Sequence, residues 1–119
     1  MNQQEQTLLN LLGYVFLQSA RPEKAAVVLA ALDALAPGQA AVIRALVLAQ
    51  LRSNKPERAL ASLDRLAMAG GVDAAFHLLR GQALVALGRP EEASVAMQNY
   101  VHMRNIGTAA AQTTPTKVI

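Results

Sequence analysis

The side chains of this chain that could carry out acid–base or metal chemistry are few and far apart. Its two histidines, His77 and His102, stand in no serine, histidine and acid trio, and no acidic cluster has metal-ligand spacing. The chain has no cysteine, which excludes disulfides, thiolate metal sites and cysteine nucleophiles. The pair Gly70-Gly71 is more simply a helix stop than a phosphate loop. We therefore expect no enzymatic activity, no metal and no cofactor, and a half-buried packing role for His77.

Charge and hydropathy limit the partners of the chain. The formal net charge is +3, and the basic residues fall mostly at expected turns without aromatic residues between them. This pattern favours a solvated rim over a nucleic-acid surface. The most apolar stretch, residues 25–51, is interrupted by Asp33, Pro37-Gly38 and Arg44, so we expect no membrane span. The amino terminus lacks the basic start of a secretory signal peptide, and the expected location is cytoplasmic.

A short motif recurs at a fixed interval and predicts the elements of the fold. Arg-Pro-Glu at 21–23 returns as Lys-Pro-Glu at 55–57 and Arg-Pro-Glu at 89–91, each followed two residues later by an alanine. These alanines, Ala25, Ala59 and Ala93, are 34 residues apart both times. A period of this length is typical of paired helices that bury their apolar faces by stacking on neighbouring pairs.

Each recurrence has a physical role at a helix boundary. Proline at 22, 56 and 90 suits a first helical turn, because its φ is already helical and its missing N–H is not needed there. Two residues earlier stand Ala20, Asn54 and Gly88, where a left-handed residue commonly ends the preceding helix, and alanine tolerates that conformation least. The sequence predicts six helices and no strand. Their expected ranges are about 4–19, 22–36, 39–53, 56–69, 73–87 and 90–104.

These motifs resemble the tetratricopeptide repeat family over about nine-tenths of the chain. Gly13, Ala25 and Pro37 match the family pattern in the first unit, and Gly81 and Ala93 match it in the third. The second unit departs, with Val47 at a small-residue position. The resemblance implies an all-α fold in which three repeats, about 6–39, 40–73 and 74–107, form a short right-handed superhelix of six antiparallel helices. The expected domain spans 1–104, followed by a flexible tail at 105–119.

In this family the first helix of each unit faces a concave groove that binds other polypeptides. Carried onto this chain, the groove positions are Asn10, Tyr14, Leu17, Arg44, Leu48, Leu51, Leu78, Gln82 and Val85. The surface is largely aliphatic and lacks the row of lysines and asparagines that clamps an acidic C-terminus. The expected ligand is therefore an apolar or amphipathic segment, such as a helix. The alternative for Leu17, Leu48 and Leu51 is that they fill the core between helices.

Length and repeat placement resemble the tetratricopeptide chaperones of bacterial type III secretion, in particular the YscY class. The best local matches are Leu12-Gly13-Tyr14, residues 21–25 and Leu35-Ala36-Pro37. The resemblance implies a chaperone that binds and stabilises a small secreted, YscX-like partner of the export apparatus, with the export gate as a further candidate partner. The mean hydropathy of +0.24 also suggests apolar surface that a partner covers.

Two other functions remain open from the sequence. The first is a translocator chaperone of the same secretion systems, for which an additional N-terminal helical region would be expected. The second is a tetratricopeptide scaffold or homo-oligomeric adaptor, a homodimer when alone, in which another copy buries the apolar face.

Overall fold

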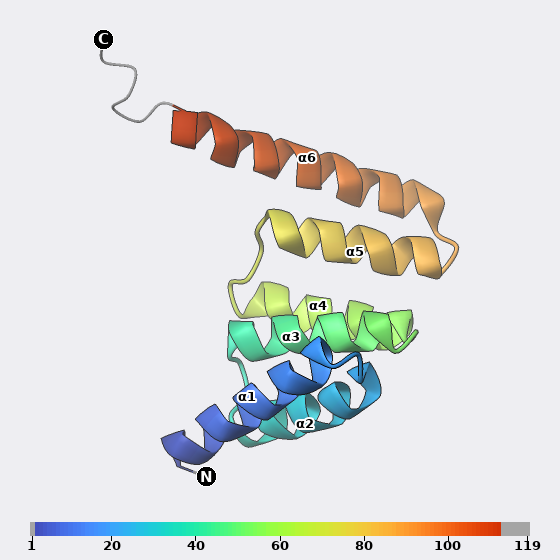
Figure 1. Cartoon of the computed structure of the whole chain (residues 1–119). Helices are drawn as coiled ribbons and strands as arrows, with labels where there is room; N and C mark the ends of the chain where they lie inside the picture. Colours follow the sequence, from blue (N-terminus) through green and yellow to red (C-terminus); the bar gives the residue numbers. More distant parts are fainter. Residues whose placement is uncertain (1, 113–119) are drawn as a thin grey trace.

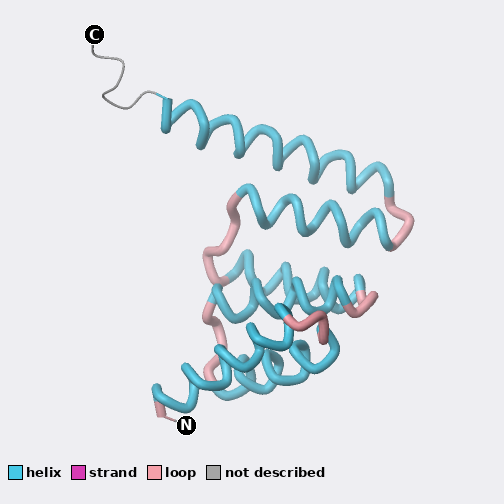
Figure 2. Tube along the Cα trace, in the orientation of Figure 1, coloured by secondary structure: helices cyan, strands magenta, loops and turns pink. Residues whose placement is uncertain are grey.

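The computed structural model describes residues 2–112, and all regular elements in this range are helices (Figures 1 and 2). The prediction of an all-α chain is thereby confirmed for this range. Short turns connect the helices, which stack pair upon pair from the N-terminal to the C-terminal end. The six helices of residues 2–112 are α1 (Gln3–Gln18), α2 (Pro22–Leu35), α3 (Ala40–Arg52), α4 (Pro56–Met68), α5 (Ala74–Ala86) and α6 (Pro90–Gln112).

The turn inside each pair has the same backbone geometry. The φ angles of Ala20, Asn54 and Gly88 are 58°, 60° and 71°, so all three residues are left-handed. In the first turn, the N–H of Arg21 donates to the carbonyl of Phe16 at 2.8 Å, and the N–H of Ala20 donates to that of Leu17 at 3.2 Å. These two bonds satisfy carbonyls that the end of a helix leaves free. The repeated motif thus specifies a repeated turn, even where alanine must adopt the left-handed conformation.

Predicted and observed helix boundaries agree within one or two residues except at the end of α6. The sequence predicts this helix to end near residue 104, whereas it continues to Gln112. Residues 105–112, predicted to belong to a flexible tail, are therefore helical, and residues 113–119 of that tail lie outside the described residues. The segment contains three consecutive alanines, which are the strongest helix formers, and the next proline is Pro115.

Small buried residues allow the two helices of each pair to approach closely. Ala25 and Ala59 are fully buried and Ala93 is 3% exposed. A Cβ added to Gly13 of α1 would lie 2.9 Å from the side chain of Leu29 in α2, which is closer than carbon atoms normally approach. Val47 occupies the corresponding position in α3 and is fully buried.

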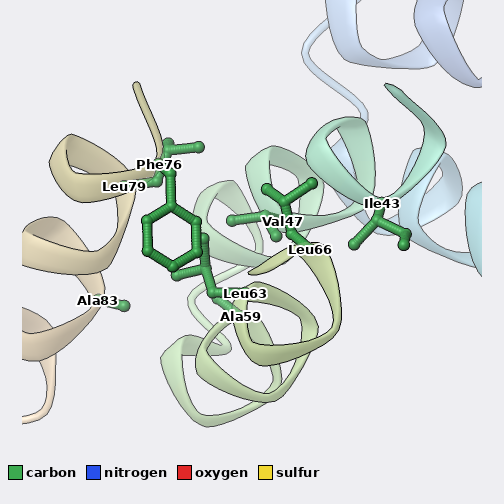
Figure 3. Close-up of a cluster of buried hydrophobic side chains, with 8 residues drawn as sticks. All are labelled: Ile43, Val47, Ala59, Leu63, Leu66, Phe76, Leu79 and Ala83. Atoms are coloured by element: carbon green, nitrogen blue, oxygen red, sulfur yellow. The ribbon is translucent and has the colours of Figure 1, made fainter. Parts of the chain in front are cut away.

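The core consists of apolar clusters that join one helix pair to the next. The central cluster, drawn in Figure 3, combines residues of α3, α4 and α5: Ile43, Val47, Ala59, Leu63, Leu66, Phe76, Leu79 and Ala83. A second cluster joins α1 and α2 to α3 through Leu17, Ala25, Leu29, Leu32, Val42, Leu46 and Ala49. Because each cluster includes residues of adjacent helices, burial itself holds the pairs in sequence order.

A buried ion pair links the second helices of the first two pairs. The carboxylate of Asp33 in α2 is 7% exposed and pairs with the guanidinium of Arg65 in α4, which is 45% exposed. The hydrogen bond to Asp33 raises the pKa of Arg65 above its ordinary value. The other carboxylate oxygen, Oδ1, is buried with no hydrogen-bond partner among the described residues. Arg65 is thus the group that compensates for burying this charge.

The first prediction tests the close crossing of α3 and α4. Ala59→Leu adds three carbon atoms at a fully buried position of the central cluster and should destabilise the fold by about 1–3 kcal/mol. Ala61→Leu makes the same change at an exposed position of α4 and should have little effect. The measurement is the midpoint of urea unfolding followed by circular dichroism. Equal midpoints for the two variants would contradict the assigned crossing.

The second prediction concerns the buried ion pair. Arg65→Met should destabilise the fold by about 3 kcal/mol, because it leaves the buried carboxylate of Asp33 without its partner. Adding Asp33→Ala to Arg65→Met should restore most of the loss, since alanine also stands one repeat later, at Ala67. Urea unfolding of both variants and of Asp33→Ala alone completes the double-mutant cycle. Additive effects of the two changes would show that the pair contributes no coupling.

Candidate functional site

The first helices of the three pairs form one continuous surface. Helix α3 packs against its own partner α4 and also contacts both α1 and α5. Helices α1, α3 and α5 are therefore neighbours, although 21 residues lie between the end of one and the beginning of the next. This adjacency brings together, on one side of the stack, the helices that carry all nine groove positions expected from the sequence.

The nine expected groove residues differ in how far they are exposed. Four are exposed, and they lie on the outer helices α1 and α5: Asn10, Tyr14, Gln82 and Val85. Four are half-buried, and most belong to the central helix α3: Arg44, Leu48, Leu51 and Leu78. Leu17 alone of the nine is buried, with 8% of its surface exposed. The exposed apolar area of this surface therefore lies mainly at Tyr14, 58% exposed, and Val85, 66% exposed.

For three leucines the sequence left open a packing role in the core. The structure places Leu17 in the cluster with Leu29 and Val42, so the core alternative holds for this residue, and no ligand could reach it without moving α1. Leu48 and Leu51 are half-buried and pack against the central cluster while part of each side chain stays accessible. A helix flanked on both sides must bury two faces, which explains why α3 exposes less apolar surface than α1 or α5.

Arg44 is engaged in contacts within the chain. Its Nη2 donates to the backbone carbonyl of Gly71 at 3.0 Å and to Oδ2 of Asp73 at 3.1 Å. The other oxygen of Asp73 accepts from the N–H of Phe76 at 2.9 Å and so caps the start of α5. Arg44 thus joins α3 to the turn before α5. The sequence could not show this, because Arg44 and Asp73 are 29 residues apart.

Helix α1 carries a second apolar surface that the sequence analysis did not single out. Its members share one face and are all exposed: Leu8 64%, Leu11 59%, Leu12 39% and Val15 47%. We call these four residues the α1 stripe. Their spacing of three and four residues places them opposite Gly13 and Leu17, which pack against α2. That spacing is visible in the sequence, but α1 is apolar on both faces, and only the structure shows which face is covered.

A shallow hollow lies between the α1 stripe and the expected groove. Thr7, Asn10, Leu11 and Tyr14 surround a volume of about 260 Å³. The residues are uncharged, so the hollow suits an apolar or weakly polar side chain rather than an ion.

The described residues contain no cluster suited to binding a metal ion. Among them no group of three histidine, aspartate or glutamate side chains lies close enough to hold a metal ion. His77 is half-buried, and its ring meets that of Phe76 edge-on with centroids 5.2 Å apart, which is a packing contact. Of helices α1 to α6 as described, none combines the length and apolar character needed to cross a bilayer.

Comparison with models of known protein families gives no match, and comparison with curated proteins gives none either.

The third prediction tests the structural role of Arg44. Arg44→Met should remove the link between α3 and the turn before α5 and destabilise the fold by about 1–2 kcal/mol, since charged hydrogen bonds are lost at a half-buried site. Hydrogen exchange of the first-turn amides of α5 should become faster. Arg52→Met, at the exposed end of the same helix, is the matched control. Equal exchange at α5 in both variants would refute this role.

Proposed function

We propose that this chain is a tetratricopeptide chaperone of bacterial type III secretion, of the YscY class, acting in the cytoplasm. It binds a small secreted, YscX-like partner of the export apparatus and keeps the apolar surface of that partner covered until assembly. The observation that carries the proposal is the recurrence of one helix-pair unit every 34 residues, combined with the continuous surface of α1, α3 and α5.

Several structural features support the repeat. Proline begins α2, α4 and α6, and a left-handed residue stands two positions before each proline. A buried alanine follows at the third position after each proline. In three tetratricopeptide units stacked as a short right-handed superhelix, each first helix would face the inside of the curve, and the contacts of α3 with α1 and α5 agree with this arrangement.

The chemistry of the surface favours an apolar or amphipathic helical ligand. The exposed groove residues are one tyrosine, one valine and two uncharged polar side chains. Arg44, the charged member of the nine, already contacts Asp73 and Gly71, so it offers little to an acidic ligand. Aromatic and aliphatic anchors with a polar edge suit a helix that presents one apolar face.

The proposed action is stoichiometric binding without chemical turnover. A chaperone of this kind needs only a surface that is complementary to its partner.

A homo-oligomeric scaffold is the second candidate function, and the α1 stripe is the observation that favours it. Four neighbouring large apolar side chains between 39% and 64% exposed form a patch of the kind that commonly marks a protein interface. The two candidates use different faces of α1, since the groove residues Asn10 and Tyr14 lie beside the stripe and not within it.

The fourth prediction tests the groove with two substitutions of the same kind. Val85→Glu places a carboxylate on the exposed groove face of α5, where valine is 66% exposed. Against an apolar ligand this charge would be desolvated, and the affinity should fall at least about tenfold. Val95→Glu makes the same change on α6, where valine is 55% exposed, and should leave binding unchanged.

The measurement is co-purification of each variant with proteins encoded next to it in its host, followed by titration of the captured partner. Circular dichroism must first show that both variants keep the helicity of the parent. Equal retention of the partner by both variants would refute the groove as the binding surface. Capture of no small secreted protein by the parent chain would refute the chaperone function itself.

A further inference from the structure

The two ends of the helix stack differ in their exposed side chains. At the C-terminal end, the exposed large apolar residues of α6 are five or six positions apart, at Val95, Val101 and Ile106, and polar residues stand between them. At the N-terminal end, the four members of the α1 stripe are adjacent on one helix face. Figure 1 shows α1 with α2 at this end of the stack. Stacks of repeats are commonly closed by polar outer faces, whereas the α1 stripe is an apolar outer face.

We propose that the α1 stripe is the interface of a homodimer, in which α1 packs antiparallel against α1 of a second copy about a twofold axis. The four stripe residues are placed symmetrically about a point between Leu11 and Leu12, so the stripes of two antiparallel copies align residue by residue. Leu11 of one copy meets Leu12 of the other, and Leu8 meets Val15. Because both contacts occur twice, one helix face supplies both sides of the interface.

The charges of α1 favour a second copy of the chain over a charged partner. Glu5 is the single charged residue among the sixteen of the helix. In the antiparallel pair, Glu5 approaches the uncharged Gln18 of the other copy, and the two helix dipoles oppose one another. A parallel pair would instead bring the two Glu5 carboxylates together and align the dipoles. A basic partner segment would find one carboxylate, and an acidic segment would find no cation on this helix.

The area available agrees with a weak dimer. The four half-exposed side chains present on the order of 400 Å², which is the size of patch that marks interaction sites on small proteins. If the stripe is buried in both copies, the interface removes on the order of 800 Å² from water in total, which is below the standard size of a stable interface. The dimer should therefore dissociate on dilution. The groove residues are outside this interface, so the inference does not depend on the proposed chaperone function.

The test uses the purified chain without any partner, studied by sedimentation equilibrium between about 1 and 200 μM. The parent should pass from monomer to dimer within this range. Leu11→Glu places a carboxylate in each half of the interface and should weaken dimerisation at least tenfold. Val27→Glu, on α2 at a valine 70% exposed, is the matched control and should dimerise as the parent does. A parent that stays monomeric at 200 μM, or a dimer that Leu11→Glu leaves unchanged, would overturn the proposal.

Single cysteines test the direction of the helices, because the chain has no cysteine of its own. Leu12→Cys lies near the twofold axis and should form an intermolecular disulfide under mild oxidation. Gln18→Cys lies far from the axis and should not. Cross-linking through both positions would indicate a parallel pair and overturn the proposed arrangement. If Leu11→Glu instead abolishes capture of a host protein by a monomeric chain, the stripe belongs to that partner and the homodimer is refuted.

Discussion

The fold depends on the close approach of the two helices in each pair. This approach is possible because small residues stand where the helices cross, with Ala25 and Ala59 fully buried and Gly13 leaving no room for a Cβ beside Leu29. A larger side chain at any of these points would separate the pair and open the clusters that join it to the next. The chain is rich in alanine and leucine and only 3% aromatic, so its core is packed by many small and medium-sized aliphatic side chains and few aromatic rings.

The way the pairs are joined determines which surfaces remain free. Apolar clusters and the ion pair of Asp33 with Arg65 connect the first two pairs, and Arg44 with Asp73 connects the second to the third. Two of the nine groove residues take part in these contacts within the chain: Leu17 packs in a cluster, and Arg44 bonds to Asp73. The exposed apolar residues of α1 lie on two faces of that helix, and α5 exposes Val85. We propose one of these surfaces for a foreign segment and the other for a second copy of the chain.

Local chemistry made much of the fold predictable. The prolines at 22, 56 and 90, the left-handed residues before them and the alanines after them act within a few residues of each other, so their effects do not depend on the rest of the structure. The end of α6 was mispredicted because the next proline after residue 104 is Pro115, and the alanine-rich sequence before it continues a helix as readily as it forms a tail. Exposure of the groove residues was only partly predictable, because α3 is covered on two sides.

Within residues 2–112, the sequence alone determined the number and order of the helix pairs and their boundaries apart from the end of α6, since a fixed period of 34 residues and the turn residues repeat in the chain itself. Only the tertiary structure decided which apolar residues are core and which are surface. Leu17 and Leu11 are both leucines of α1, yet one is 8% and the other 59% exposed. Burial depends on which neighbour packs against each face, and contacts such as Arg44 with Asp73 join residues that sequence spacing cannot relate.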